Sequence, residues 1–354
     1  MKIANIVLTS QNGGVEQVFL DYCKVLQDLN HEVVAIVKPD APYAYLAAEL
    51  GVKLERIKNK FGYYDPLAIK KIATVLKQND CDVVFAHAGR AMVLARKAIK
   101  KIKNKTVFLI SINHSNNVKR SIGADIVLSV NKEILYKTID AGQRPERSFV
   151  ISNAIDVSDV ELPAQRYLSR KKKITIGALG RFDDTKGFDL LIEALKIANK
   201  KSKKEILLKL AGSGVEENNL RQLVADLKLA DKVEFCGWIA DKKKFFSEID
   251  IFCIPSRTET FGIVILEAMK YGKPIISSNS DGAKEILRNE VDALIVDGKD
   301  DRQVVQKIAE AILNLSQDST LANSLVKSAF ARLQNNFSFE MLKKCLQEIL
   351  PDKL

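Results

Sequence analysis

The segment 255–268, with the sequence PSRTETFGIVILEA, joins an apolar strand to an apolar helix. The strand is the run IDIFCI at 249–254, and the polar residues that follow it form a turn. The pattern predicts a helix that begins near Gly262 and points its first backbone N–H groups into one small space. Such a helix N-terminus is an anion site, and a glycine there lets a ligand approach the backbone closely.

Two glutamates flank this anion site. Glu259 lies just before it, and Glu267 lies about one turn inside the helix. An ionised carboxylate only accepts hydrogen bonds, so the pair suggests bound hydroxyl groups. A phosphate with a sugar on either side fits the helix N-terminus and both glutamates. The competing interpretation is an ordinary strand–loop–helix with two solvated glutamates.

Strand-like and helical patterns alternate along the whole chain. Short apolar, β-branched runs lie at 2–8, 31–37, 83–88, 106–112, 125–130 and 148–152, and again at 174–180, 205–214, 232–238, 250–256, 273–278 and 293–298. Segments with apolar residues at helical spacing separate them. This alternation predicts an α/β fold of two doubly wound, Rossmann-like domains facing across a cleft. Any ligand is then expected at the carboxyl ends of the strands, in the crevice between the domains.

A polar stretch between the two series contains Pro163 and ends in a basic run, which is typical of a linker. We therefore expect an N-terminal domain over 1–160, a linker over 161–173 and a second domain over 174–335. The remainder, 336–354, contains an amphipathic helix that we expect to cross back to the N-terminal domain.

Composition describes a globular protein with an excess of positive charge. The 354 residues carry a formal net charge of +11, and no apolar run approaches the roughly 18 residues of a membrane span. The first residues read as a strand and lack a signal-peptide pattern, and the five cysteines form no paired framework, so a cytoplasmic protein is expected. The lysine clusters have no nucleic-acid-binding signature beside them, so nucleic acid is not expected as a partner, and solvated surface explains most clusters.

Two cations open the second domain. Arg181 and Lys186 follow a predicted strand whose end should face the same crevice as the 255–268 segment. Arginine offers a planar fork to phosphate and lysine a compact charge. Together they could neutralise a diphosphate leaving group without a metal. Taken alone, the motif could equally be two surface cations in a loop.

Glycine turns after three other strands could shape a nucleotide pocket. The residues concerned are Gly13 and Gly14 in the first turn, Gly212 and Gly214 in AGSG, and Trp238 and Ile239 after Gly237. Adjacent glycines at 13–14 let the backbone take positive φ and approach a ligand. Backbone groups around Trp238 could read a planar base. Ordinary turn chemistry explains these turns about as well.

The chain has three histidines. His31 precedes a strand and is expected to be structural, whereas His87 and His114 both end predicted strands. His114, which has polar neighbours, is the better candidate for a site. Asp80 and Asp82 resemble a metal-binding aspartate pair but precede their strand, so a turn is favoured, and no other metal spacing is present.

These motifs together resemble the retaining glycosyltransferases of the large family-four group, which have the GT-B fold. Glu259 and Glu267, with Phe261 and Gly262 between them, are similar to that family's motif of two spaced glutamates. The resemblance continues through 268–276, 281–285 and 297–298, and includes 180–181, 186–187, the turn at 13–14, His114 and 152–156. It covers most of the chain, is strong across 174–300 and is thinner in the first domain.

The resemblance also implies residue roles. Arg181 and Lys186 would bind the donor diphosphate, Glu267 the nucleotide ribose and Glu259 the transferred sugar. His114 would lie over the sugar near the reacting carbon. The backbone donors to sugar and phosphate would come from Phe261, Gly262, Ile263 and Val264.

The implied activity is that of a retaining, metal-independent glycosyltransferase. A hexose-type sugar would move from a nucleotide-sugar donor, expected to be UDP-linked, to a glycan or lipid-linked acceptor. Lipopolysaccharide or cell-surface polysaccharide synthesis would be the setting, with the first domain binding the acceptor and the second the donor. No cofactor is expected, because the nucleotide sugar is a co-substrate.

Two alternatives remain open from the sequence. A nucleotide-sugar epimerase could use the same scaffold, and so could a non-catalytic protein that keeps the donor pocket. The presence of all the expected site residues argues against loss of catalysis.

One surface pattern suggests a membrane partner. The segment 90–105 is predicted to form a basic helix, and the nearby sequence 58–64 places aromatic residues beside lysines. Basic residues with aromatic neighbours can rest on an anionic leaflet. The apolar positions of the helix could instead pack on their own sheet and leave only a basic face. Peripheral binding to the inner face of the cytoplasmic membrane is therefore one expectation, and a soluble acceptor the other.

Overall fold

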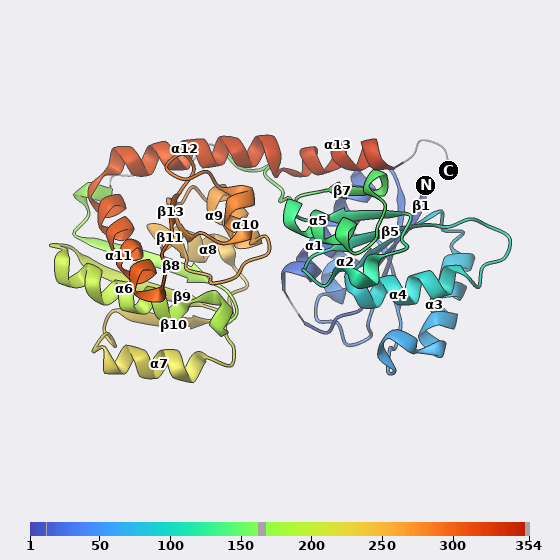
Figure 1. Cartoon of the computed structure of the whole chain (residues 1–354), viewed down its shortest axis with the longest axis horizontal. Coiled ribbons are helices and arrows are strands. Elements are labelled where there is room, and N and C mark those ends of the chain that lie inside the picture. The colour runs from blue at the N-terminus through green and yellow to red at the C-terminus, as the bar shows by residue number, and fades with distance from the viewer. Residues whose placement is uncertain (12, 162–167, 351–354) are drawn as a thin grey trace. The chain divides into compact units, whose positions relative to one another are not determined.

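Two parallel sheets, each covered by helices, build the protein (Figure 1). The computed structural model describes residues 1–11, 13–161 and 168–350. The first unit comprises Met1–Ile155 and the C-terminal segment from Ser338, and the second comprises Asp156–Phe337. The predicted fold class, two doubly wound Rossmann-like units, is confirmed. Part of the expected linker, 162–167, lies outside the described residues.

The first unit contains a seven-stranded sheet in the order β3-β2-β1-β4-β5-β6-β7, with every pair parallel. The strands are β1 (Lys2–Val7), β2 (Glu32–Val37), β3 (Lys53–Arg56), β4 (Val83–His87), β5 (Phe108–Asn113), β6 (Ile126–Ser129) and β7 (Ser148–Val150). The strand order reverses between β1 and β4, where ligands of open α/β sheets bind. The edge strand β3 is absent from the sequence prediction, because its residues KLER are half-buried or exposed and form no apolar run.

The helices of this unit are α1 (Gly14–Asp28), α2 (Ala44–Glu49), α3 (Pro66–Gln78), α4 (Ala88–Ile99), α5 (Lys132–Asp140) and α13 (Phe339–Ile349). The last of these returns to the first unit: Ser338 forms a parallel bridge with Ile155, and Lys343 pairs with Asp28 at 3.0 Å. The predicted basic helix over 90–105 is too long, since α4 ends at Ile99.

The second unit contains a six-stranded parallel sheet in the order β10-β9-β8-β11-β12-β13. Its strands are β8 (Lys173–Leu179), β9 (Glu205–Ala211), β10 (Val233–Gly237), β11 (Ile251–Ile254), β12 (Ile275–Ser278) and β13 (Leu294–Val296). Its helices are α6 (Phe188–Lys201), α7 (Glu217–Asp226), α8 (Lys242–Ser247), α9 (Ile263–Lys270), α10 (Asp281–Ile286), α11 (Asp301–Gln317) and α12 (Ser319–Asn336). The central strand β8 pairs with β9 and β11, and the loops that follow β8 and β11 carry the predicted site.

Candidate active site

The predicted helix N-terminus is present after β11. Helix α9 begins at Ile263, and its N-cap Gly262 has φ 86° and ψ 69°, a left-handed conformation that favours glycine. The preceding loop is fixed from the side, because the N–H of Gly282 in α10 donates to the Glu259 carbonyl at 2.8 Å. A Cβ atom on Gly282 would lie 2.5 Å from the Phe261 carbonyl oxygen. The backbone that leads into α9 is therefore held closely against Gly282.

Lys186 and Glu259 meet at this loop. Lys186 ends the short helix η5 (Asp184–Lys186), and its Nζ lies 2.6 Å from Glu259 Oε2. Their side chains are only 21% and 13% exposed, so solvent screens the pair weakly. Arg181, in the same loop as Lys186, is 67% exposed, and its Nε lies 3.1 Å from Asp183 Oδ2. The structure thus places one of the two predicted cations directly at a predicted glutamate.

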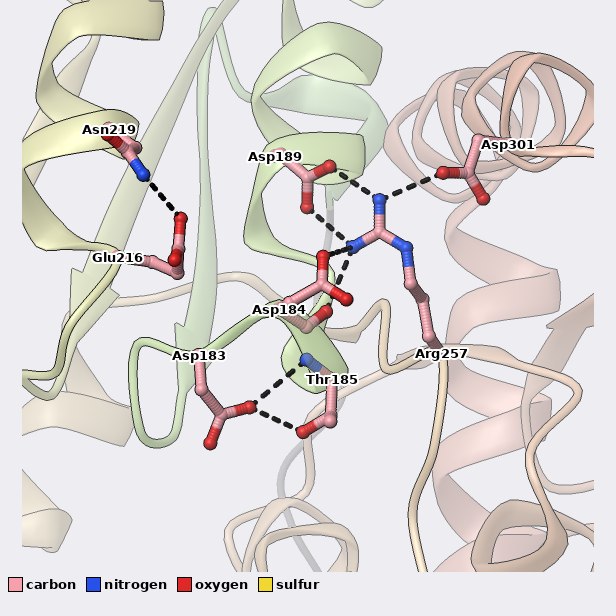
Figure 2. A network of polar contacts seen from close by, with 8 residues as sticks. All are labelled: Asp183, Asp184, Thr185, Asp189, Glu216, Asn219, Arg257 and Asp301. Carbon is pink, nitrogen blue, oxygen red and sulfur yellow. Dashed lines mark hydrogen bonds and ion pairs between the residues drawn. The ribbon is translucent and has the colours of Figure 1, made fainter.

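Arg257 binds the two loops to each other (Figure 2). Its guanidinium donates to both carboxylate oxygens of Asp189, at 2.9 and 2.5 Å, and to Asp301 Oδ2 at 2.9 Å. It also donates to the backbone carbonyl of Asp184 at 2.9 Å. These hydrogen bonds connect the Glu259 loop with η5, α6 and α11. Arg257 lies inside the 255–268 segment, but its role could not be predicted from that segment because its partners Asp189 and Asp301 are distant in sequence.

Glu267 is buried and has one partner that the sequence analysis missed. Its Oε1 accepts a short hydrogen bond from Lys242 Nζ, at the start of α8. Its Oε2 is buried and has no hydrogen-bond partner in the described structure. Burial raises the pKa of the Glu267 carboxyl, and the nearby Lys242 acts in the opposite direction. An orphaned buried acceptor about one turn inside α9 is suited to a ligand hydroxyl group.

The turn at 212–214 supports the Arg181 loop through backbone packing. A Cβ atom on Gly212, which has φ +136°, would lie 1.9 Å from the Gly180 carbonyl oxygen. One on Gly214 would lie 2.2 Å from the Phe182 carbonyl oxygen. Both positions therefore require glycine. Beyond β10, Trp238 is 63% exposed and Ile239 is half-buried.

The glycine pair of the first unit differs from the prediction. Gly13 is the N-cap of α1 with φ −153°, ordinary extended backbone, and neither Gly13 nor Gly14 has positive φ. The Gly13 N–H donates to Glu16 Oε2 at 3.0 Å, so a side-chain cap shapes this turn. The expectation of positive φ at these glycines is wrong.

His114 lies just after β5, stacked on His87. The two rings are 5.3 Å apart with an interplanar angle of 12°, and His87 Nδ1 lies 3.1 Å from His114 Nε2. Burial lowers the pKa of His114 to about 4 and that of His87 well below its usual value, so both rings are neutral near neutral pH. The sequence analysis placed both histidines at strand ends but missed their contact.

Neither a metal-ligand cluster nor a membrane-spanning helix is present in the described residues. Among residues 1–11, 13–161 and 168–350, no group of three or more His, Cys, Asp or Glu side chains is arranged to hold a metal ion. Asp80 and Asp82 instead share Lys105, whose Nζ lies 2.8 and 2.7 Å from their carboxylates. Over the same described ranges, no helix combines the length and apolar character needed to span a bilayer.

Comparison with known proteins identifies the class of enzyme. Residues 12–159 match the family model Glycosyltransferase Family 4, and residues 160–331 match the model Glycosyl transferases group 1. The chain is also 27% identical to the lipopolysaccharide core biosynthesis glycosyltransferase LpsE of Rhizobium meliloti, over 97% of each protein. The chain is a glycosyltransferase of the GT-B fold. The predicted resemblance is thus confirmed.

Other relatives of this glycosyltransferase have different names and the same architecture. It is 25% identical to a phosphatidyl-myo-inositol mannosyltransferase of Mycolicibacterium smegmatis, over 91% of this chain and 86% of that protein. Its fold is similar to that of Anabaena HepE, solved in complex with UDP and glucose, with a TM-score of 0.82, 21% identity and 99% of each chain covered. At that identity the likeness shows the fold alone.

Proposed function

We propose that this glycosyltransferase moves a hexose-type sugar from a UDP-sugar to a glycan or lipid-linked acceptor, in lipopolysaccharide or other cell-surface glycan synthesis. One observation carries the donor assignment: two lysine–glutamate pairs lie along the segment that enters α9, Lys186–Glu259 before the helix begins and Lys242–Glu267 about one turn inside it. Cations, hydroxyl acceptors and free helix N–H groups are what a sugar diphosphate requires. Sugar transfer to a cell-surface glycan or lipid is supported by the names of LpsE and the mannosyltransferase. A UDP-linked donor is supported by the complex of HepE with UDP and glucose.

The proposed roles follow from charge. Lys186 and Arg181 bind the diphosphate, and the backbone of Phe261, Gly262, Ile263 and Val264 donates to phosphate and sugar. Glu259 accepts hydrogen bonds from the transferred sugar, and the orphaned Oε2 of Glu267 accepts one from the ribose. His114 contacts the transferred sugar. Gly212, Gly214, Trp238 and Ile239 shape the nucleotide pocket.

The proposed reaction is a front-face transfer that retains the anomeric configuration and needs no metal. The bond from the anomeric carbon to the diphosphate breaks, and one from that carbon to the acceptor oxygen forms. The acceptor proton passes to the departing phosphate oxygen, and UDP leaves. Lys186, Arg181 and the α9 N-terminus stabilise the negative charge that develops on the diphosphate.

A panel of sugar nucleotides tests this function. Calorimetry should show binding of one UDP-sugar, and mass spectrometry should show slow release of free UDP from it in the presence of a chelator. Proton NMR of the product should show the donor's anomeric configuration. Epimerised donor without release would support an epimerase, and tight binding with no turnover under any acceptor would support a binding protein.

We also propose that the first unit touches an anionic membrane surface. Phe61, Tyr64 and Leu67 are 67%, 74% and 72% exposed, and the Nζ of Lys97 lies 3.9 Å over the Tyr64 ring. The apolar residues of α4 do not contribute, because Met92 and its apolar neighbours are buried in their own core. Exposed lysines lie close in sequence to the aromatic residues, at 58, 60 and 70, and just after α4, at 100, 101 and 103.

Vesicle sedimentation tests the membrane proposal. The full chain should sediment with anionic vesicles at low salt, be released at high salt because screening weakens the attraction, and ignore neutral vesicles. Replacing both Phe61 and Tyr64 by serine should weaken the binding. Failure to bind anionic vesicles at low salt would contradict the proposal and favour a soluble acceptor.

A further inference from the structure

His87 is a buried histidine that the proposed reaction does not use directly. It ends β4, is 1% exposed, and lies between Asn5 of β1 and His114. The rings of Phe19 and Tyr22 meet it edge-on at 5.8 and 5.3 Å. A buried neutral imidazole has one donor and one acceptor nitrogen, and both need partners. The partners therefore determine where its proton lies.

The hydrogen bonds of Asn5 fix the direction of the chain of contacts. Its Nδ2 donates to the Phe19 carbonyl at 3.0 Å, which leaves Oδ1 as the atom that faces His87. Oδ1 lies 2.9 Å from His87 Nε2 and can only accept, so His87 carries its proton on Nε2. The Nδ1 of His87 is then a lone-pair acceptor for the Nε2–H of His114, 3.1 Å away. His114 is left with an unprotonated Nδ1.

The surroundings do not support a charged His87. The titratable side chains nearest to it are Tyr22 and His114 in direct contact, and Cys23 through Asn5. Burial raises the pKa of Tyr22 above its usual range and that of Cys23 to about 12, so neither supplies a negative charge. A proton on His87 would place an uncompensated cation in the core, and one on the half-buried His114 would lie beside it without a negative partner among these groups.

We propose that Asn5 and His87 are positioning residues that hold His114 as a neutral, Nε2-protonated ring, whose Nδ1 accepts a hydrogen bond from a hydroxyl of the donor sugar. The part that concerns the sugar rests on the proposed function. The arrangement suits a transfer in which positive charge develops on the sugar, because an imidazolium beside it would oppose bond cleavage. It makes His114 a hydrogen-bond acceptor rather than an acid.

Nitrogen NMR of the full chain tests the arrangement without any substrate. The chain has only three histidines, so long-range proton–nitrogen spectra of histidine-labelled protein contain three ring patterns. His31→Gln assigns one pattern and serves as the control, because His31 lies outside this chain of contacts and its loss should leave transfer unchanged. His87 and His114 should both show protonated Nε2 and should not titrate near neutral pH. A protonated Nδ1 on His114 in the unaltered protein would overturn the proposal.

Asn5→Asp should reverse the direction of the hydrogen bonds. A carboxylate at Nε2 stabilises a doubly protonated His87, which then donates from Nδ1 and drives the His114 proton from Nε2 to Nδ1. Asn5→Leu removes the acceptor without adding charge, and should give His114 a mixture of the two protonation forms. It keeps the test valid if the aspartate variant does not fold. An unchanged His114 spectrum in the folded variants would refute the role of Asn5.

Activity then separates this inference from the proposed function. Asn5→Leu should lower kcat about fivefold to tenfold, the usual effect of one lost hydrogen bond, with little change in the KM for the donor. Altered His114 spectra with unchanged kcat would overturn the proposed use of Nδ1 by the sugar, while leaving the positioning by His87 intact. An enzyme that binds no sugar nucleotide would overturn the proposed function, and the nitrogen spectra would still decide the protonation of His114.

Discussion

Replacement of Arg257 should loosen the two loops that carry Lys186 and Glu259. Its guanidinium makes four hydrogen bonds, three of them to carboxylate oxygens. The side chains of Asp189 and Asp301 are 37% and 62% exposed, so solvent weakens their ion pairs with Arg257. We therefore assign each of the four contacts the stabilisation typical of exposed ion pairs, about 0.5 kcal/mol. Arg257→Ala should therefore cost about 2 kcal/mol of unfolding free energy in the second unit. A unit of this size should lose roughly 4–8 °C in Tm.

Differential scanning calorimetry of the full chain measures this loss as a shift of one unfolding transition. Arg257→Lys keeps the charge but not the planar fork, so it should recover only part of the loss. The matched control is Arg221→Ala, which removes an exposed helical pair with Glu217 and a cation–π contact with Phe235, and should cost about 1 kcal/mol. Donor affinity should fall in the Arg257 variants and stay unchanged in the control.

Two results would refute the reasoning about Arg257. An Arg257→Ala protein as stable as the Arg221→Ala control would mean that solvent screens the carboxylate contacts completely. A large loss of stability with unchanged donor affinity would mean that the loops keep their positions without Arg257. In the second case, the hydrogen bond from Gly282 to Glu259 would be sufficient to position the loop.

Lys186→Ala and Arg181→Ala should each lower kcat about 100- to 1000-fold with the fold intact, measured by UDP release, and near-normal turnover in both would contradict the diphosphate assignment. Glu267→Ala should act mainly on nucleotide affinity, because a ribose contact is similar in ground and transition states. Since burial raises the pKa of Glu267, its carboxylate form is lost at a higher pH than that of an ordinary glutamate, so calorimetry should show UDP affinity falling early on acidification. The same shift means that ionised Glu267 opposes folding, so Glu267→Gln should raise the Tm more at neutral than at acid pH; an equal effect at both would argue against the shift. Gly212→Ala should cost about 2–3 kcal/mol or more, and Gly237→Ala, also at positive φ but with open space around it, should cost clearly less in the same thermal unfolding assay.

The sequence was sufficient for features that are local along the chain. The apolar run, turn and helix of 249–268 predicted both the strand β11 and the start of α9 near Gly262, because strand and helix periodicity are local signals. The same dependence on local pattern explains why strand β3 could not be predicted. Its residues are exposed or half-buried at the edge of the sheet, so they form no apolar run. The sequence predicted a helix that continues to residue 105, whereas α4 ends at Ile99. The lysines after Ile99 are compatible with a helix and with a surface turn, so they do not mark the helix end.

Contacts between distant segments were harder to predict. Lys242 begins a tract of three lysines, and nothing in that tract distinguishes the one that meets the buried Glu267. Arg257 likewise depends on Asp301, which follows it by more than forty residues. The contact between His87 and His114 was easier to predict from the sequence. His87 ends β4 and His114 follows the adjacent parallel strand β5, and the register that pairs His87 with Ile112 places both residues at the same edge of the sheet.

The Lys186–Glu259 pair suggests that the donor would bind the proposed site in steps. Lys186 cannot neutralise a diphosphate fully while its Nζ lies 2.6 Å from Glu259, so phosphate binding should draw the ammonium away. Both carboxylate oxygens of Glu259 would then be available to accept hydrogen bonds from sugar hydroxyl groups. Because separating Lys186 from Glu259 costs free energy, those hydrogen bonds would offset the cost only when the sugar is attached to the nucleotide. Free UDP would leave Glu259 without a partner, whereas a UDP-sugar would replace the lysine with hydroxyl donors. The same charges that hold the loop together would therefore favour the intact donor over the spent nucleotide, which suits the proposed reaction, in which UDP would have to leave after each transfer.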